Sequence, residues 1–387
     1  MHQSETRGLV RSMKLQPPQY IQNLKPYRPG KPIEETEREF GLKQVVKLAS
    51  NENPLGPSPK AIEAMKTQLA DSHRYPDANL FYLRQTLSKI TKMSPESFLF
   101  GAGSDQAIDF LVKTYLTPGD EAVTSESAFV AFKVNASAQG VQLHETPLNK
   151  DMAFDLEAMG QIVTDHPNTK MAYIANPNNP TGTSNTAEEV IAFLETVRRC
   201  GRPFLVLLDY AYWEYVTDPS IPDPYKLQKD YPDQVVVLKT FSKIYGLGGV
   251  RIGYAMGNSE ILEPAQRIRP PFSNHSLSLV GAQAALGDQE FLDRSFSINE
   301  AGKKQWQDFF KTHKFDVLPT QGNFYLVNVK RSMGLSGNEV FQKSLPKGVI
   351  FRAVDNYGLE DFLRISIGTK EENQKAMDVL STLIQSK

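Results

Sequence analysis

Cysteine is nearly absent from this chain of 387 residues, in which Cys200 is the single example. One thiol cannot close a disulfide within the chain, and it cannot build a zinc site of the cysteine type. The six histidines are scattered and show no paired helical spacing. The sequence therefore predicts neither disulfides nor a bound metal.

An excess of charge of one sign is also missing. Lysine and arginine number 43 and aspartate and glutamate 44, which gives a net charge of −1. Such a balance provides no long-range attraction to nucleic acid or to an anionic membrane. We therefore expect no partner of either kind, and a small acidic substrate must be captured by local arginines.

Long apolar runs are lacking as well. No run approaches the roughly 20 residues that a membrane-spanning helix needs. The first 14 residues are polar and of mixed charge, without the apolar core of a secretory signal. The expected location is the cytoplasm.

The middle of the chain alternates short apolar runs with amphipathic segments. Strand-like runs occur at 171–175, 204–208 and 235–238, and 187–199 places its apolar residues on one helical face. Buried strands that alternate with crossover helices indicate a parallel sheet covered on both faces. We predict an α/β fold with a large domain of this kind.

The ends of the chain predict a second, smaller α+β domain. A long helical pattern covers 289–313, strand-like segments follow at 324–329, 349–352 and 363–367, and Thr369 and Glu372 form a capping box before a last helix. Prolines and a glycine between 25 and 32 favour an extended arm. The predicted division is an arm at 1–35, a small domain from 36–60 with 289–387, and a large domain at 61–288.

Reactive polar residues gather where the predicted parallel strands end. The segment 176–182 (NPNNPTG) follows one strand, Asp209 the next, and Lys243 the third. Open parallel sheets bind ligands at the carboxyl ends of their strands. Three such clusters predict a ligand site at that edge of the sheet.

Each cluster alone permits an ordinary interpretation. Lys243 is either a nucleophilic amine in a cleft or a lysine that extends to solvent. Asp209 is either the partner of a pyridinium nitrogen or a turn residue. The glycines of 101–104 (GAGS) either bind phosphate at a helix start or form a tight turn. Arg251 suits phosphate oxygens, and Arg364, in an apolar strand, requires an anion.

In order and spacing, these segments together resemble the class I and II aminotransferases, which are pyridoxal-phosphate (PLP) enzymes of fold type I. The residues that carry the resemblance are 176–182 (NPNNPTG), 209–212 (DYAY), 240–243 (TFSK), Arg251 and Arg364. Within that family the chain is most similar to histidinol-phosphate aminotransferases, at 26–32 (PYRPGKP), 48–54 (LASNENP), 74–76 (RYP), 101–104 (GAGS) and 363–369 (LRISIGT).

The resemblance implies a role for each matching position in holding PLP. Lys243 forms the covalent bond to the cofactor and carries the proton, with Asp209 and Tyr212 as the other catalytic residues. Asp209 pairs with the ring nitrogen, Tyr212 and Asn179 with the ring hydroxyl, and Phe129 stacks on the ring. The phosphate is held by Gly103, Ser104, Asp105, Thr240, Ser242 and Arg251.

The resemblance also implies a homodimer with shared active sites. Tyr75 reaches the cofactor phosphate of the neighbouring subunit, and Tyr27 reaches its substrate. Arg364 binds the substrate's carboxylate or phosphate, Arg352 helps to bind the phosphate, and Asn53 and Asn179 also contact substrate.

The implied reaction is ping-pong transamination of histidinol phosphate with 2-oxoglutarate, in histidine biosynthesis. Alternatives are an aromatic (phenylalanine or tyrosine) aminotransferase, a PLP enzyme like threonine-phosphate decarboxylase, and a PLP-binding protein without turnover. Tyr210, Ser273 and His275 depart from the usual family pattern. Ser273 and His275 weaken the substrate assignment if their loop lines the pocket.

Overall fold

The computed structural model describes residues 15–24 and 30–385. Its larger unit is built on a seven-stranded sheet of order β2-β8-β7-β6-β5-β3-β4. The strands are β2 (Phe98–Gly101), β3 (Glu121–Ser125), β4 (Gln142–Thr146), β5 (Thr169–Ala175), β6 (Leu205–Asp209), β7 (Val235–Thr240) and β8 (Gly253–Met256). All run parallel except β8, which is antiparallel to β2 and β7. The predicted α/β fold with a mostly parallel sheet is confirmed.

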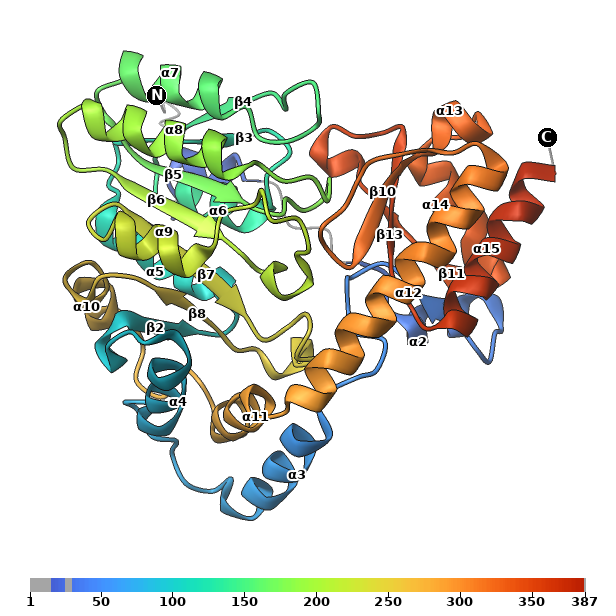
Figure 1. Cartoon of the computed structure of the whole chain (residues 1–387), viewed down its shortest axis with the longest axis horizontal. Coiled ribbons are helices and arrows are strands. Elements are labelled where there is room, and N and C mark those ends of the chain that lie inside the picture. The colour runs from blue at the N-terminus through green and yellow to red at the C-terminus, as the bar shows by residue number, and fades with distance from the viewer. Residues whose placement is uncertain (1–14, 25–29, 386–387) are drawn as a thin grey trace, which may run out of the picture.

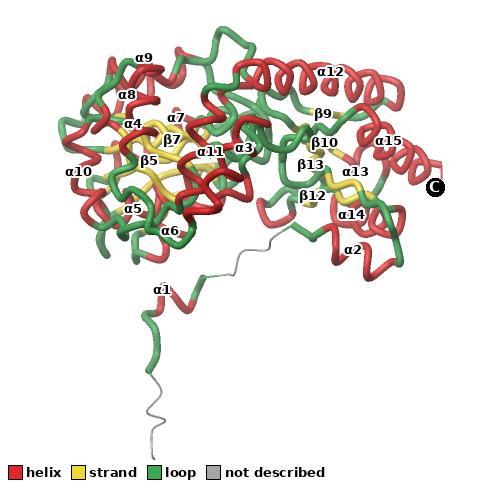
Figure 2. The backbone as a smooth tube through the Cα atoms, turned by 90° about the horizontal axis from the view of Figure 1, so that it is seen from below, coloured by secondary structure: helices red, strands yellow, loops and turns green. Residues whose placement is uncertain are grey.

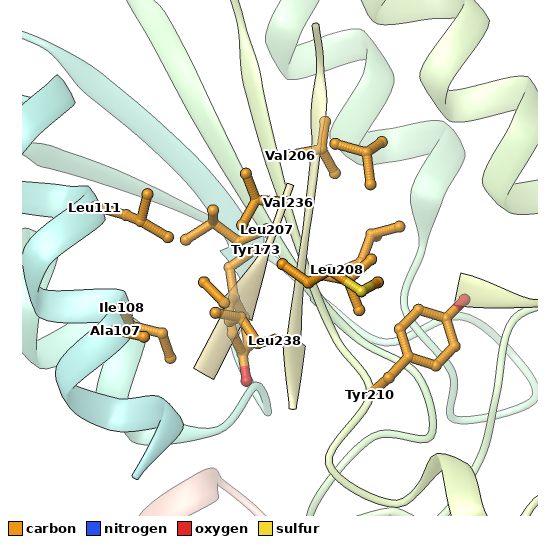
Figure 3. Close-up of a cluster of buried hydrophobic side chains, with 14 of the residues drawn as sticks. Ala107, Ile108, Leu111, Tyr173, Val206, Leu207, Leu208, Tyr210, Val236 and Leu238 are labelled. Atoms are coloured by element: carbon orange, nitrogen blue, oxygen red, sulfur yellow. The ribbon is translucent and has the colours of Figure 1, made fainter. Parts of the chain in front are cut away.

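Helices cover both faces of this sheet. In Figure 1, α7, α8 and α9 lie on one face, and α5 and α6 lie on the other. The helices of this unit are α3 (Pro59–Gln68), α4 (Phe81–Thr91), α5 (Ser104–Tyr115), α6 (Val130–Ala138), α7 (Leu156–Asp165), α8 (Ala187–Arg199), α9 (Pro224–Asp230), α10 (Ser259–Arg267) and α11 (Ser276–Leu286). Figure 3 shows the core between α5 and the central strands, where Ile108 and Leu111 face Leu207, Val236 and Leu238. Strands buried on both faces explain why their sequences are continuous apolar runs.

The smaller unit contains a four-stranded antiparallel sheet of order β12-β13-β10-β9 and a two-stranded parallel pair, β1 with β11. Its strands are β1 (Val46–Lys47), β9 (Asp316–Val317), β10 (Phe324–Asn328), β11 (Val349–Ile350), β12 (Arg352–Ala353) and β13 (Phe362–Ser366). Its helices are α2 (Ile33–Phe40), α12 (Gln289–His313), α13 (Val329–Met333), α14 (Gly337–Ser344) and α15 (Lys370–Gln385). The β1–β11 pair joins a segment near the N-terminus to the C-terminal part of the chain.

The long helix α12 runs from the junction of the two units along the smaller one (Figures 1 and 2). Its bounds, and those of α8, are the ones that the sequence predicts. The capping box before α15 is also confirmed, since Thr369 N donates to Glu372 Oε2 at 2.8 Å and Glu372 N to Thr369 Oγ1 at 3.2 Å.

Two local predictions need correction. The single strand predicted at 349–352 is wrong, because β11 and β12 belong to different sheets and buried Phe351 separates them. The predicted extended arm contains a short helix, α1 (Gln19–Gln22). Within the described ranges no helix is both long and apolar enough to cross a membrane.

Candidate active site

One pocket opens at the carboxyl ends of the parallel strands, the position that the sequence predicts. It collects every predicted cofactor residue except Tyr75. The predicted residues that line it are Gly103, Ser104, Asp105, Phe129, Asn179, Asp209, Tyr212, Thr240, Ser242, Lys243 and Arg251. They come from four strand–helix connections and from the connection between β7 and β8, so the fold rather than the local sequence brings them together.

Lys243 lies in the turn after β7. Its Nζ is 3.4 Å from the carbonyl oxygen of Ser50 and 5.5 Å from the centre of the Tyr212 ring. The turn continues to Gly246, which has a φ of 68°, and a Cβ there would lie 2.0 Å from the carbonyl oxygen of Gly56. Only glycine permits this approach, so the turn that carries Lys243 packs directly on the 56–57 loop.

Asp209 is the last residue of β6 and is only 5% exposed. Its Oδ2 accepts a hydrogen bond from the Tyr173 hydroxyl at 2.7 Å, and its Oδ1 accepts one from the Ala211 amide at 2.9 Å. Burial raises the pKa of the carboxyl group to about 6, although both hydrogen bonds act to lower it. A cation held against this carboxylate would offset the cost of its burial, and the protonated ring nitrogen of PLP is such a cation.

The hydroxyl of Tyr212 is oriented by a residue that the sequence reasoning missed. Asn51 Nδ2 donates to it at 2.9 Å, and Asn51 Oδ1 accepts from Ser366 Oγ at 2.9 Å. Asn51 itself has a φ of 55°, in the left-handed region that asparagine tolerates. This network crosses from the smaller unit to the larger one.

Tyr173 is the second missed residue. It lies fully buried in β5, and its hydroxyl points to Asp209. A signal was available, because a tyrosine inside an apolar strand usually needs a hydrogen-bond partner when it is buried.

The phosphate end of the pocket is formed by the start of α5 and by Arg251. Gly103 precedes the helix with a φ of 87°, and a Cβ there would lie 2.7 Å from Arg251 Nη2. Arg251 donates from Nη1 to the Gly248 carbonyl at 3.0 Å and from Nη2 to the Ala102 carbonyl at 3.1 Å, and it lies 3.7 Å from Asp105 Oδ2. Free amides at a helix start beside a fixed guanidinium suit a phosphate group.

Two hydroxyl groups complete this end of the pocket. Thr240 Oγ1 donates to Ser242 Oγ at 2.9 Å and accepts from the Ser242 amide at 3.1 Å. Phe129, immediately before α6, contributes an aromatic side chain to the wall. The residues present therefore fit each part of PLP: aldehyde, ring nitrogen, ring face and phosphate.

The two arginines predicted to bind substrate do not line the pocket themselves, but Arg364 contacts Asn179, which does. Arg364 in β13 is 6% exposed, donates from Nη1 to Asn179 Oδ1 at 2.5 Å and from Nη2 to the Ala49 carbonyl, and lies over the Phe324 ring. Arg352 is the direct partner of Arg364 in the β12–β13 ladder. Directly paired residues project to the same face of a sheet, so the Arg352 and Arg364 side chains leave the same face of the β12–β13 pair.

Two other predicted residues, Tyr75 and Asn53, do not line the pocket. Tyr75 is 83% exposed and stacks on Phe272 at 4.7 Å, in a separate groove. Asn53 does not line the pocket, because its Nδ2 donates to the Ile244 carbonyl at 2.7 Å and to Ser295 Oγ at 2.9 Å. These contacts support a structural role for Asn53 and give no support to the predicted substrate contact. Tyr27 lies outside the described residues.

The residues that depart from the family pattern serve the fold. Tyr210 is buried and donates from its hydroxyl to the Pro222 carbonyl at 3.1 Å. His275 caps α11 by accepting from the Ser278 amide at 3.3 Å, and Ser273 lies 3.5 Å from Arg269 Nη1. None of the three lines the pocket.

Comparison with known proteins agrees with this geometry. The family model for aminotransferase class I and II matches residues 43–380. The histidinol-phosphate aminotransferase of Brevibacillus brevis is 41% identical over 370 residues, which cover 96% of this chain and 99% of that protein. The Bacillus subtilis enzyme of the same name is 39% identical, with coverage of 95% and 99%.

A solved structure is similar over nearly its whole length. Histidinol-phosphate aminotransferase from Sinorhizobium meliloti in complex with pyridoxal-5'-phosphate superimposes with a TM-score of 0.85 at 27% identity, covering 98% of this chain and all of that one. The chain therefore belongs to the aminotransferase class I and II family, which comprises PLP-dependent enzymes of fold type I.

Proposed function

We propose that this enzyme transfers the amino group of histidinol phosphate to 2-oxoglutarate, as a cytoplasmic step of histidine biosynthesis. The observation that carries the proposal is the pairing of Arg352 with Arg364 in the β12–β13 ladder, because Arg364 donates to Asn179, which lines the cofactor pocket. Two adjacent guanidinium groups suit a substrate with a phosphate, and one of them can bind the carboxylate of the second substrate. The names of the relatives agree with this choice.

The residues of the pocket divide the work of holding PLP. Arg251, Ser242 and the start of α5 would bind the phosphate, and Asp209 would keep the ring nitrogen protonated. Asn179 and Tyr212 would orient the ring through its hydroxyl. When bound, the cofactor supplies an aldehyde for the substrate amine and a cationic ring that accepts an electron pair.

Lys243 would then move the proton. It is the only lysine among the described residues that line the pocket. Its Nζ would take the proton from the α-carbon of the substrate and return it on the product side, acting first as a base and then as an acid. Arg364 would hold the substrate in place during both steps, since Asn179 and Ala49 fix its guanidinium group.

The substrate assignment predicts a specific effect of Arg352. Arg352→Gln is expected to lower kcat/KM for histidinol phosphate by about 10- to 100-fold, because it removes a charge-assisted hydrogen bond to phosphate. Activity with phenylalanine and with histidinol should change by less than about twofold. The measurement is a panel of histidinol phosphate, histidinol, phenylalanine, tyrosine and threonine phosphate, with keto product and CO2 both assayed.

The unphosphorylated histidinol is the matched control, because it differs from the proposed substrate only in the phosphate. A higher kcat/KM for phenylalanine would make the enzyme an aromatic aminotransferase. CO2 release from threonine phosphate would indicate a decarboxylase. Either result would overturn the substrate that we propose.

We also propose that the enzyme is a homodimer with shared active sites. Tyr75, Tyr82 and Pro76 line an apolar groove with Leu279 and Val280, and exposed Phe272 stacks on Tyr75. Apolar aromatic surface of this kind marks protein interfaces. A second copy seated here could bring Tyr75 to the cofactor phosphate of its partner.

Mixed dimers test this sharing. Lys243→Ala and Tyr75→Ala are each expected to impair both sites of a homodimer. Their mixed dimer carries both lesions in one site and none in the other, so co-expression should restore roughly a quarter of wild-type activity. If the activity of the co-expressed pair is only the mean of the activities of the two variant homodimers, Tyr75 does not serve the neighbouring site.

A further inference from the structure

Three side chains able to bind a metal meet at the far end of the large sheet. They are Glu121 at the start of β3, His144 in β4, and His166 immediately after α7. Their ligand atoms all lie within 4.8 Å of one another. Glu121 Oε2 is 2.6 Å from His144 Nε2 and 3.2 Å from His166 Nδ1, and the two imidazole rings are 4.2 Å apart.

The sheet explains why Glu121 and His144 meet. In the parallel β3–β4 ladder, Glu121 pairs with Gln142 and Val123 with His144. Residues two apart in a strand share a face, so Glu121 and His144 are diagonal neighbours on one face. Helix α7 covers β3 and β4, and its end delivers His166 to the same place.

The backbone around the cluster is held in position. The His166 amide donates to the Ile162 carbonyl at 2.9 Å, and the His166 carbonyl accepts from the Thr169 amide at 3.0 Å and from Arg202 at 3.2 Å. The Glu121 amide donates to the Asn168 carbonyl at 3.0 Å. The three side chains are thus presented by a rigid frame, which is the condition for a preformed ligand set.

The nearby lysines are engaged with other carboxylates, and Arg202 donates to backbone carbonyl groups. Lys170 pairs with Asp120 at 2.6 Å, and Lys133 pairs with Glu145. Within the described part of the chain, Glu121 forms ion pairs with two histidines, His144 and His166, and with no lysine or arginine. Glu121 and His144 have side chains 15% and 14% exposed, whereas His166 is 41% exposed. An ion could therefore enter from solvent past His166.

We propose that Glu121, His144 and His166 form a binding site for a zinc-type transition-metal ion. Two imidazoles and one carboxylate are a ligand set that zinc accepts, whereas magnesium and calcium prefer oxygen ligands. With bonds of about 2.0–2.2 Å, tetrahedral zinc requires ligand atoms about 3.3 Å apart. The distance from Glu121 Oε2 to His166 Nδ1 already matches this value. Small rotations of the Glu121 and His144 side chains would bring the other two ligand–ligand distances to about 3.3 Å as well. Water would fill the fourth position.

The proposed site is separate from the chemistry of transamination. Glu121 stands at the amino end of β3, and the cofactor pocket lies at the carboxyl ends of the strands. A bound ion would join β3, the edge strand β4 and the end of α7. We therefore expect it to stabilise this edge of the large unit and to leave turnover unchanged.

The test is a zinc titration of the PLP-loaded enzyme after treatment with a chelator. Calorimetry is expected to show one Zn²⁺ bound per chain, and the melting temperature should rise by about 2 °C at saturation. His144→Gln and His166→Gln should each weaken binding at least tenfold, since even outer residues of metal sites contribute this much. His313→Gln, at the end of α12 and outside the cluster, is the matched control and should bind like the wild type.

Anomalous diffraction at the zinc edge locates the ion directly and does not depend on any variant's stability. The expected result is a peak between the three side chains. Absence of Zn²⁺ binding by the wild-type enzyme would overturn the proposal. So would binding that His144→Gln and His166→Gln leave unchanged, because the ion would then lie elsewhere.

Discussion

Replacing Lys243 with alanine is expected to lower kcat by about 10⁴-fold or more, the upper end of what one positioned acid–base group contributes. The cofactor should still bind, because Arg251, Asp209 and the start of α5 remain. The visible absorbance of the wild-type enzyme is expected to disappear on addition of glutamate. In the variant this response should be lost. Stopped-flow absorbance and steady-state turnover measure both effects.

A small exogenous amine provides the control for misfolding. The variant has a cavity where the Lys243 side chain lay, next to the Ser50 carbonyl and the Tyr212 ring. An added alkylamine can enter it and move the proton, so turnover should rise with amine concentration. Full turnover without any added amine would contradict the role assigned to Lys243.

The Asp209→Asn variant is expected to show two opposite effects. In the loaded enzyme, kcat should fall by about 10²–10³-fold, because a preorganised charge beside the ring nitrogen is lost. In the cofactor-free protein, the same change should raise the free energy of unfolding at pH 8 by roughly 3 kcal/mol. The second effect follows from the pKa of Asp209, which burial raises to about 6.

The sign of the pH dependence follows from proton binding. Asp209 binds its proton more tightly in the folded protein, so it destabilises the folded state as pH rises from about 4 to about 6. Above pH 6 the full cost is present, and below pH 4 it vanishes. Asparagine carries no such cost. The increase in the free energy of unfolding of the Asp209→Asn variant over the wild type should therefore be largest at pH 8 and about half as large at pH 5. Urea unfolding of both cofactor-free proteins at these two pH values measures the difference; a gain that did not depend on pH would contradict this account of Asp209.

The large sheet and its site could be predicted because their signals are local. Continuous apolar runs predict the strands β5, β6 and β7. The polar residues that follow each run indicate the edge of the sheet at which ligands bind. The helices α8 and α12 could be predicted because their apolar residues recur at helical spacing. For Lys243, the motif spacing and the observed pocket lead to the same position.

The contacts that escaped prediction join segments far apart in the chain. Asn51 meets Tyr212 across 161 residues, and Tyr173 meets Asp209 across 36. Glu121, His144 and His166 have no motif spacing, since strand register and the end of α7 bring them together. The division of 349–352 between two sheets has the same origin, because strand pairing is decided by tertiary packing.

The central claim is that Lys243 is the amine that bonds to the cofactor. Reduction of the loaded enzyme with borohydride makes that bond permanent, and peptide mass spectrometry then identifies the labelled residue. The account predicts a single phosphopyridoxyl group on the peptide that contains Lys243, and none in Lys243→Ala. A label on a different lysine of the wild-type enzyme, or no label at all, would contradict it.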